Sequence, residues 1–316
     1  MKLRYIKYLL ALLALAGLFL VPYYVESGYY IYIIILLFTY ITMASSWNIL
    51  AGFAGQVCLG NGAFFGAGAF TMLIAIRLGY GTLFSMLIGI AMATGLALAL
   101  IPLFRLRGAY FAIGTLFFAF AVQLAYIYRQ AILFEELIIT VPIGEALPVN
   151  YYYTLALLLA LASVLTAIYI SKSRFSYALN AIRDDEDVAE ELGINPIKYK
   201  LMALLIAAFY MGCAGAIFIH FAGRGYPPNL FGLTWSINPV FITILGGIGT
   251  IFGPIVGAAI FVLLSEMFTG LLRELSLLVW AITLVALIHI APQGVYGFIK
   301  QKIVERRAIS LPKLSS

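Results

Sequence analysis

The stretch "SGYYIYIIILLFTYITMASSWNILAGFAGQVCLGNGAFFGAGAFTMLIAI" (residues 27–76) contains no Asp, Glu, Lys or Arg. A second stretch without charge covers residues 225–265. A helix needs about 20 apolar residues to cross a bilayer, so residues 27–76 alone are long enough for two passes. The apolar residues run continuously, whereas the strands of a membrane barrel alternate apolar and polar residues. The stretch therefore predicts membrane-spanning helices.

The composition points the same way along the whole chain. Of its 316 residues, 64% are hydrophobic and 10% are charged, whereas soluble domains carry about 25% charged residues. We therefore predict an all-α, polytopic integral membrane protein of the cell (inner or plasma) membrane, with a single transmembrane domain over residues 1–316. About ten transmembrane or re-entrant helices are expected, over residues 5–25, 30–50, 63–77, 82–104, 109–129, 151–171, 201–222, 231–250, 254–272 and 277–292.

The distribution of positive charge predicts the orientation. Inner loops are enriched in Lys and Arg, and an inner N-terminus places 15 of the 19 basic residues on that side. Both termini are therefore predicted to be inside, with the basic tail 300–316 at the inner membrane surface. The first residues resemble a secretory signal up to Ala16, but apolar sequence continues to Val21, which favours an uncleaved first helix. The four basic residues on the outer side are Arg77, Arg129, Arg224 and Arg273.

Residues 48–70 combine many glycines with polar residues inside an apolar run. Glycine costs about 1 kcal/mol in a helix relative to Ala, so this stretch disfavours a continuous helix. Non-helical backbone at membrane depth is tolerated only inside protein or beside a water-filled cavity. A broken or re-entrant segment beside a translocation pathway is favoured for Asn48, Gln56 and Asn61, and close helix packing through small residues is the alternative. The glycines are Gly52, Gly55, Gly60, Gly62, Gly66 and Gly68.

A second Gly-rich break lies at residues 243–263 and weakly repeats the first. Gly249, Gly253 and Gly257 recur every four residues after Gly246, which predicts a stripe of small residues on one helix face, for close packing of a second helix. Pro254 lacks a backbone donor and predicts a helix start or break. Gly/Pro-interrupted segments in two halves of a chain indicate the central pathway of a transporter.

The segment "YALNAIRDDEDVAEELGINPIKYK" (residues 177–200) is a charged island on the predicted inner side. Asp184 is expected to cap a short helix, and Val188 and Leu192 then share one face. Gly193 is expected to end that helix, and Asn195 to cap the next one with Pro196 at its first position. The pattern favours a docking element for a cytoplasmic partner, with Ile194 also in the apolar contact, over a merely ordered loop.

The sequence contains no motif that predicts catalysis or nucleotide binding by this chain. The dipeptide Gly-Lys never occurs, so it has no P-loop, and a separate ATPase is expected to bind ATP; no cofactor and no metal is predicted. Cys58 and Cys213 are expected to be apolar packing residues. Glu266 allows a proton relay or a structural pairing with an outer Arg, and His220 and His289 are expected to pack near helix ends. No catalytic constellation and no nucleic-acid partner is predicted.

Four stretches together resemble the membrane subunits of ABC importers for branched-chain amino acids, the LivM-like permeases. The likeness covers nearly the whole length. It implies a heteromeric assembly with a sister permease, two cytoplasmic ATP-binding subunits and an external solute-binding protein. The four stretches are "SWNILAGFAGQVCLGNGAFFGAGAF" (45–69), "RLRGAYFAIGTL" (105–116), "ALNAIRDDEDVAEELGINPIKYKLMA" (178–203) and "ILGGIGTIFGPIVGAA" (244–259).

The resemblance assigns expected roles to two groups of residues. In this family the third stretch looks like the segment that seats on the ATPase, here a coupling segment over about 172–200. The coupling residues are expected to be Arg183, Asp184, Asp187, Val188, Glu191, Leu192, Gly193 and Ile194. The residues expected on the translocation pathway are Asn48, Gln56, Asn61, Tyr110, Thr115, Gln123 and Asn238.

Two departures from the family bear on the solute. Asn61 stands where members often have His, and residues 132–150 replace a Thr-Gly-Gly-rich stretch. Importers of urea, amides or aromatic acids share this type of subunit, so the solute is a branched-chain amino acid or a related small polar molecule. The rival hypotheses are a self-sufficient secondary transporter or channel, which needs ion ligands in its spans, and an intramembrane enzyme, which needs a catalytic cluster.

Overall fold

The computed structural model describes residues 17–24, 27–134, 138–145, 147–271 and 294–298. Its main elements are α2 (Gly28–Asn48), the π-helix η1 (Ile49–Phe53), α3 (Asn61–Arg77), α4 (Thr82–Leu98), the 3-10 helix η2 (Ile101–Arg105) and α5 (Ala109–Phe134). After them come β1 (Ile139–Thr140), η3 (Ile143–Glu145), α6 (Val149–Ser171), α7 (Arg174–Asp184), α8 (Glu186–Glu191) and α9 (Pro196–Ala222). The last are β2 (Arg224–Gly225), α10 (Pro227–Leu230), α11 (Leu233–Gly246) and α12 (Gly253–Leu271).

The all-α membrane architecture is confirmed. Within the described residues, six helical stretches are long and apolar enough to cross a membrane, and Asn61–Arg77 and Gly253–Met267 are shorter apolar helices. The expected total of ten is not confirmed, because most of segment 5–25 and all of segment 277–292, with His289, lie outside the described residues. The six long stretches are Gly28–Phe53, Thr82–Arg105, Ala109–Ile132, Val149–Ser171, Pro196–Ala222 and Pro227–Gly246.

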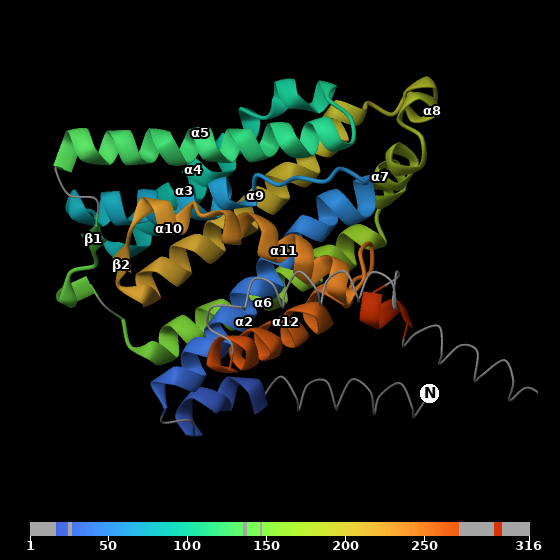
Figure 1. The fold of residues 1–316 in the computed structure, drawn as a ribbon. Helices are drawn as coiled ribbons and strands as arrows, with labels where there is room; N and C mark the ends of the chain where they lie inside the picture. Colours follow the sequence, from blue (N-terminus) through green and yellow to red (C-terminus); the bar gives the residue numbers. More distant parts are fainter. Residues whose placement is uncertain (1–16, 25–26, 135–137, 146, 272–293, 299–316) are drawn as a thin grey trace, which may run out of the picture.

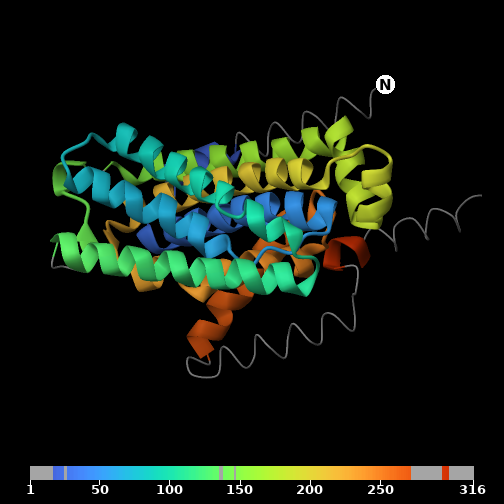
Figure 2. The same ribbon diagram turned by 90° about the horizontal axis from the view of Figure 1, so that it is seen from above.

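The long helices form one bundle with two distinct ends. Figures 1 and 2 show α7 and α8 at one end, and Figure 1 places the short ribbon of β1 and β2 at the other. The charge distribution predicts that the α7–α8 end is cytoplasmic and the β1–β2 end external, and the two ends are named accordingly below. The ribbon is antiparallel, with Ile139 opposite Gly225 and Thr140 opposite Arg224.

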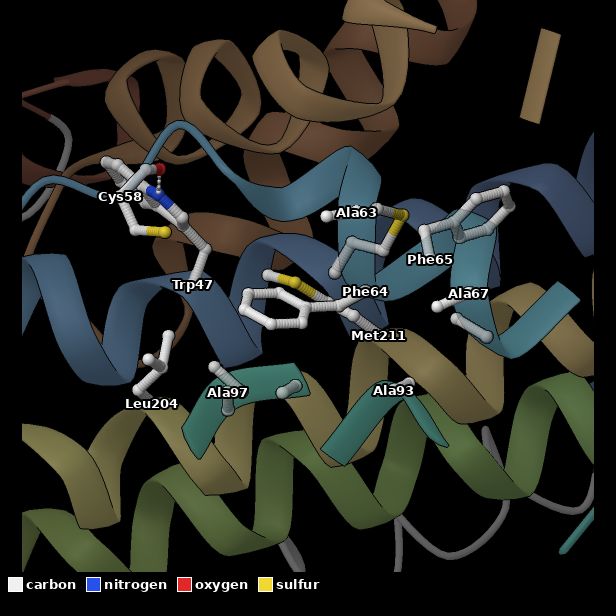
Figure 3. Close-up of a cluster of buried hydrophobic side chains, with 14 of the residues drawn as sticks. Trp47, Cys58, Ala63, Phe64, Phe65, Ala67, Ala93, Ala97, Leu204 and Met211 are labelled. Carbon is white, nitrogen blue, oxygen red and sulfur yellow. Dashed lines mark hydrogen bonds between the residues drawn. The ribbon is translucent and has the colours of Figure 1, made fainter. Parts of the chain in front are cut away.

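The centre of the bundle is α3, which packs against α4 and α9 through small residues. A Cβ on Gly68 would collide with the carbonyl of Gly212, and one on Gly215 would collide with the carbonyl of Phe65. Such close approach of backbones is how small residues associate helices in lipid. Figure 3 shows the large side chains that fill the space between them, among them Phe64, Met211 and Trp47.

The two predicted breaks are present, and one prediction about them is wrong. After η1, residues 55–60 have no regular secondary structure, and residues 247–252 separate α11 from α12. Gly249 lies in this loop with φ +75°, so it does not share a helix face with Gly253 and Gly257. The close packing is made by Gly246 and Gly257, whose added Cβ atoms would collide with backbone of α12 and α11, respectively.

Candidate functional site

The charged island folds as the short helix α8 between α7 and α9. Its N-cap is Asp185, whose Oδ1 accepts hydrogen bonds from the backbone N–H groups of Asp187 (2.9 Å) and Val188 (3.1 Å). The prediction that Asp184 caps this helix is therefore wrong by one residue. Asp184 ends α7, and Asp185 is the residue with extended backbone (φ −157°, ψ 118°), which is the conformation that an N-cap requires.

The other boundary predictions in this segment are confirmed. Gly193 has φ +83°, and its N–H donates to the carbonyl of Glu190 (2.9 Å) while that of Ile194 donates to Ala189 (3.0 Å). These two bonds form a Schellman C-terminus, which favours glycine at the left-handed position. Asn195 Oδ1 then accepts from the N–H of Lys198 (3.1 Å), with Pro196 as the first residue of α9.

Two basic residues from other parts of the chain fasten α8 to the bundle. Arg107, between η2 and α5, forms two hydrogen bonds to the carboxylate of Asp187, at 2.9 and 2.6 Å. Lys200 of α9 is only 1% exposed, and its Nζ lies 2.7 Å from Glu186 Oε2. The Arg107 guanidinium holds the pKa of Asp187 below its ordinary value of 3.8. Exposed pairs contribute little stability, whereas the buried ammonium of Lys200 needs its partner.

The opposite side of α8 presents apolar side chains to solvent. Val188 is 51% exposed and Leu192 is 74% exposed, whereas Ala189 between them is buried. Glu190 and Glu191 are exposed beside them. An ordered, projecting helix with exposed aliphatic groups and a rim of carboxylates is typical of a protein contact surface. We call Val188, Leu192 and the neighbouring Glu190 and Glu191 the α8 face.

Arg183 links α7 to the first Gly-rich break. Its Nη1 donates to the carbonyl of Gly52 at 3.1 Å, and its side chain also forms an ion pair with Asp184 at 3.5 Å. The aliphatic stem lies under Gly55, where an added Cβ would be 2.7 Å from Arg183 Cγ. The cytoplasmic helices therefore contact the break directly and are not connected to it only through the chain.

Both Gly-rich breaks meet at this position. Asn48 Nδ2 donates to the carbonyl of Thr250 at 2.8 Å, and its Oδ1 accepts from the N–H of Gly249, also at 2.8 Å. An added Cβ on Gly52 would collide with Asn48 Oδ1 and lie 2.8 Å from the Gly249 nitrogen. The weak repeat seen in the sequence thus corresponds to the end of α2 with η1 and the loop 247–252, which are in direct contact near α7.

The first break continues as an extended segment, residues 55–60. Figure 1 shows it, in blue, running back from the α7 end toward the middle of the bundle, where α3 begins. Val57 is exposed, and its neighbours Gln56 and Cys58 are buried. Part of the backbone is satisfied by side chains, because Leu59 N–H donates to Thr115 Oγ1 (3.0 Å) and the carbonyl of Cys58 accepts from Trp47 Nε1 (2.7 Å).

Asn61 begins α3 at the end of this extended segment and is buried. Its Nδ2 donates to the carbonyls of Ser236 (3.0 Å) and Cys58 (3.4 Å). Its Oδ1 has no hydrogen-bond partner among the described residues. Ser236 Oγ also accepts from the N–H of Gly62 at 2.9 Å, so α11 and the start of α3 share a polar contact inside the apolar core.

The seven residues expected on the pathway do not converge on one site. Gln56, Asn61 and Thr115 surround the extended segment, and Asn48 bridges the two breaks. Gln123 of α5 donates to the carbonyl of Pro228 at 3.2 Å, and Asn238 of α11 donates to Tyr40 Oη at 2.9 Å. Tyr110 near the start of α5 points outward and is exposed.

Four further residues give mixed outcomes. Glu266 pairs with the hydroxyl of Tyr29, so the expected structural pairing exists but its partner is a tyrosine and not an Arg. His220 is buried near the end of α9, where its Nδ1 lies 2.8 Å from Tyr152 Oη. Cys58 and Cys213 are both buried and unpaired, as expected for packing residues.

The sequence did not indicate the partners of the island. Arg107 and Lys200 were noted only as inner positive charges, and nothing local pairs Arg107 with Asp187, which lies 80 positions away. A pocket at the external end was also missed, because its walls come from β1, β2, α9, α10 and α11. The local sequence feature that points to this pocket is Arg224, a basic residue between two apolar segments on the predicted outer side.

A bundle of apolar helices with glycine breaks at one end, next to an ordered cytoplasmic helix pair, defines a multi-pass membrane permease. The chain belongs to the family described as "Branched-chain amino acid transport system / permease component", whose model matches residues 29–288. One relative is the high-affinity branched-chain amino acid transport system permease protein LivM of Escherichia coli (strain K12), 29% identical over 91% of this chain and 74% of that protein.

The protein with the same name from Salmonella typhimurium (strain LT2) is 28% identical over the same shares of the two chains. No solved structure matches the chain.

Proposed function

We propose that this chain is one of two membrane subunits of an ATP-driven importer and that it forms, with a sister permease, the pathway for a branched-chain amino acid. ATP is bound by two cytoplasmic partner subunits, and an external binding protein delivers the solute. The membership in the permease family and the names of the relatives support the solute class. No ATP site is assigned to this chain.

The α8 face is the observation that carries the proposal. It is ordered by its own caps, projects from the cytoplasmic end of the bundle (Figure 1), and exposes Val188 and Leu192. The side of α8 turned to the bundle is fixed by ion pairs to Arg107, in the loop before α5, and to Lys200 of α9. A rigid, exposed apolar surface is suited to bind a partner that transmits force. A flexible loop in its place would absorb the partner's movement.

Arg183 provides the route by which that movement reaches the membrane. A displacement of α7 acts on Gly52 through the hydrogen bond of the guanidinium and on the second break through Asn48, which holds Gly249. Left-handed glycines such as Gly55 and Gly249 absorb backbone rotation at low cost. We infer that the helices beyond the two breaks change their tilt together when the ATP-binding subunits close.

The extended segment supports a pathway on the same side of the bundle. Backbone outside a helix does not face lipid at membrane depth, so residues 55–60, where Val57 is exposed, are expected to be covered by protein or by water. A sister permease supplies the protein cover, and a solute channel between the two subunits supplies the water. Residues 55–60 and the nearby Tyr110 are therefore assigned to this interface.

The test is uptake by liposomes that contain this chain with its sister permease and the two ATP-binding subunits. Addition of ATP inside and of loaded binding protein outside is expected to drive accumulation of leucine. Leu192→Asp places a charge on the α8 face and is expected to lower uptake at least tenfold, since burying an unpaired carboxylate is costly. Arg105→Gln, at an exposed position of η2 outside the coupling segment, is the control.

Two results would contradict the proposal. Uptake that survives deletion of residues 184–194 shows that the α8 face is not the ATPase contact. Uptake of leucine by this chain alone, without ATP and partners, favours a self-sufficient transporter.

A further inference from the structure

The external end of the molecule contains a pocket of about 500 Å³. This volume lies within the range of about 300–1,000 Å³ that is typical of sites for small molecules. Its walls come from segments far apart in the sequence, because the pairing of β1 with β2 brings Thr140 next to Arg224. The residues around it include Arg224, Tyr226, Asn229, Trp235, Phe218 and Leu230.

One side of the pocket is apolar and aromatic. The Trp235 ring stacks on Phe65 with a centroid distance of 4.0 Å and meets Phe218 edge-on at 5.0 Å. These contacts fix the indole, so the aromatic wall has a defined shape. Leu230 of α10 and Ile138 before β1 add aliphatic surface. Such a wall suits a branched aliphatic side chain and offers nothing to a strongly hydrated ion.

The other side carries polar groups that bind an anion. Arg224 is exposed at the rim, and no carboxylate of the described residues forms an ion pair with it. A guanidinium binds a carboxylate through two parallel hydrogen bonds. The amide of Asn229 and the hydroxyl of Tyr226 line the same pocket and can donate further bonds to a carboxylate.

We propose that this pocket binds a small carboxylate with an apolar side chain, and that it is the first site in the permease to receive the solute from outside. The proposal rests on the proposed import function and deepens it, since it names the residues that recognise the solute. Arg224 holds the carboxylate, and Trp235 with Phe218 contacts the apolar side chain. The pocket lies at the end of the bundle opposite to α7 and α8 (Figure 1), where an external protein delivers its solute.

The experiment uses the complete transporter in lipid nanodiscs without the external binding protein. Binding of radiolabelled leucine is measured in competition with 4-methylpentanoate, which lacks the amine, and with leucinol, which lacks the carboxylate. We expect 4-methylpentanoate to compete and leucinol to be at least about tenfold weaker, because only a charged partner gains the full bond to a guanidinium.

Variants of two external arginines identify the site. Arg224→Gln is expected to lower leucine affinity at least about tenfold. Arg224→Lys keeps the positive charge but loses the two parallel donors of the guanidinium, so a smaller decrease in affinity is expected. Arg129→Gln, at the exposed outer end of α5, is the control and is expected to bind as the wild type does. Monodispersity and basal ATP hydrolysis verify that each variant is folded.

Three outcomes overturn the proposal. They are absence of leucine binding by the wild type, equal competition by leucinol, and unchanged leucine affinity in Arg224→Gln. If Arg224→Gln keeps leucine affinity but loses stimulation of ATP hydrolysis by the binding protein, the pocket receives that protein instead of the solute. ATP-driven uptake by the same purified transporter, reconstituted in liposomes and supplied with loaded binding protein, tests the import function separately, so the two proposals fail independently.

Discussion

Gly52 lies where the two Gly-rich breaks and the guanidinium of Arg183 meet, and no side chain fits there. An added Cβ would collide with Asn48 Oδ1, and the Gly249 nitrogen would be 2.8 Å away. The carbonyl of the same residue accepts the hydrogen bond from Arg183. A single glycine therefore determines how closely α2 approaches the loop before α12.

Gly52→Ala is expected to destabilise the protein by about 1–3 kcal/mol, the usual cost of overpacking. The amide of Asn48 must move, and its bonds to Gly249 and Thr250 are strained or lost. Gly95→Ala is the control, because no atom lies within 4 Å of an added Cβ there. Thermal unfolding in detergent measures both, and equal melting temperatures for the two variants would refute the crowding argument.

Arg183→Met is expected to lower the amount of solute transported per ATP about tenfold. Methionine keeps an aliphatic stem under Gly55 but removes the donor to the Gly52 carbonyl, a bond to a charged group that is worth about 1.5–3 kcal/mol. Uptake and ATP hydrolysis are measured in the same liposomes. Arg105→Met, exposed in η2 and outside the coupling segment, should leave the ratio unchanged. A parallel fall in both rates for Arg183→Met would indicate lost assembly and not lost transmission.

At the scale of the element, α8 is held by ion pairs of unequal strength, including a longer one of 3.9 Å between Arg107 and Glu186. Glu186 faces Lys200, which is almost fully buried, whereas Asp187 faces the exposed Arg107. Truncation of Asp187 leaves a solvated guanidinium. Truncation of Glu186 leaves an ammonium with no solvent and no counter-ion, which is far more costly.

Glu186→Ala is therefore expected to destabilise the α8–α9 region by about 3–5 kcal/mol, and Asp187→Ala by less than about 1 kcal/mol. Hydrogen exchange of residues 186–200 measures the two effects locally, with the adjacent acid as the internal control. Similar protection in both variants would mean that Lys200 finds another partner.

At the scale of the whole molecule, one part of the outer surface of the bundle is expected to contact lipid and another part to contact a partner protein. Much of α4 is exposed within the chain and is regular helix, which lipid accepts. Val57 is exposed in a segment without regular secondary structure, and lipid does not accept non-helical backbone. The segment around Val57 therefore indicates where a partner subunit contacts this chain.

Cysteine scanning distinguishes these two surfaces. In a variant with Cys58 and Cys213 replaced by Ala, a cysteine at Val57 (37% exposed) is compared with one at Leu87 of α4 (62% exposed). Val57→Cys in the assembled transporter is expected to react with hydrophilic thiol reagents or to cross-link to the sister permease. Leu87→Cys should react only with lipid-soluble reagents. The same lipid-only reactivity at Val57 would contradict the interface.

Whether a feature of this chain can be predicted from sequence depends on how close together in the chain the residues that determine it lie. Gly193 and Asn195 were placed correctly because a C-terminal glycine and an Asn-Pro start act within one turn. The cap at Asp184 was off by one, since either acid can cap and the end of α7 decides between them. Gly249 was placed on a helix because spacing by four fits a helix face and a loop equally well.

The sequence by itself determined that this chain crosses a membrane and where helices break, because hydropathy and glycine act through neighbours in the chain; positive charge predicts which end is cytoplasmic. Only the tertiary structure decided that the two breaks touch, that Arg183 reaches the first of them, and that Arg224 and Trp235 line one pocket. Those contacts join residues up to about 200 positions apart, and their geometry depends on how whole helices pack, which no local pattern specifies.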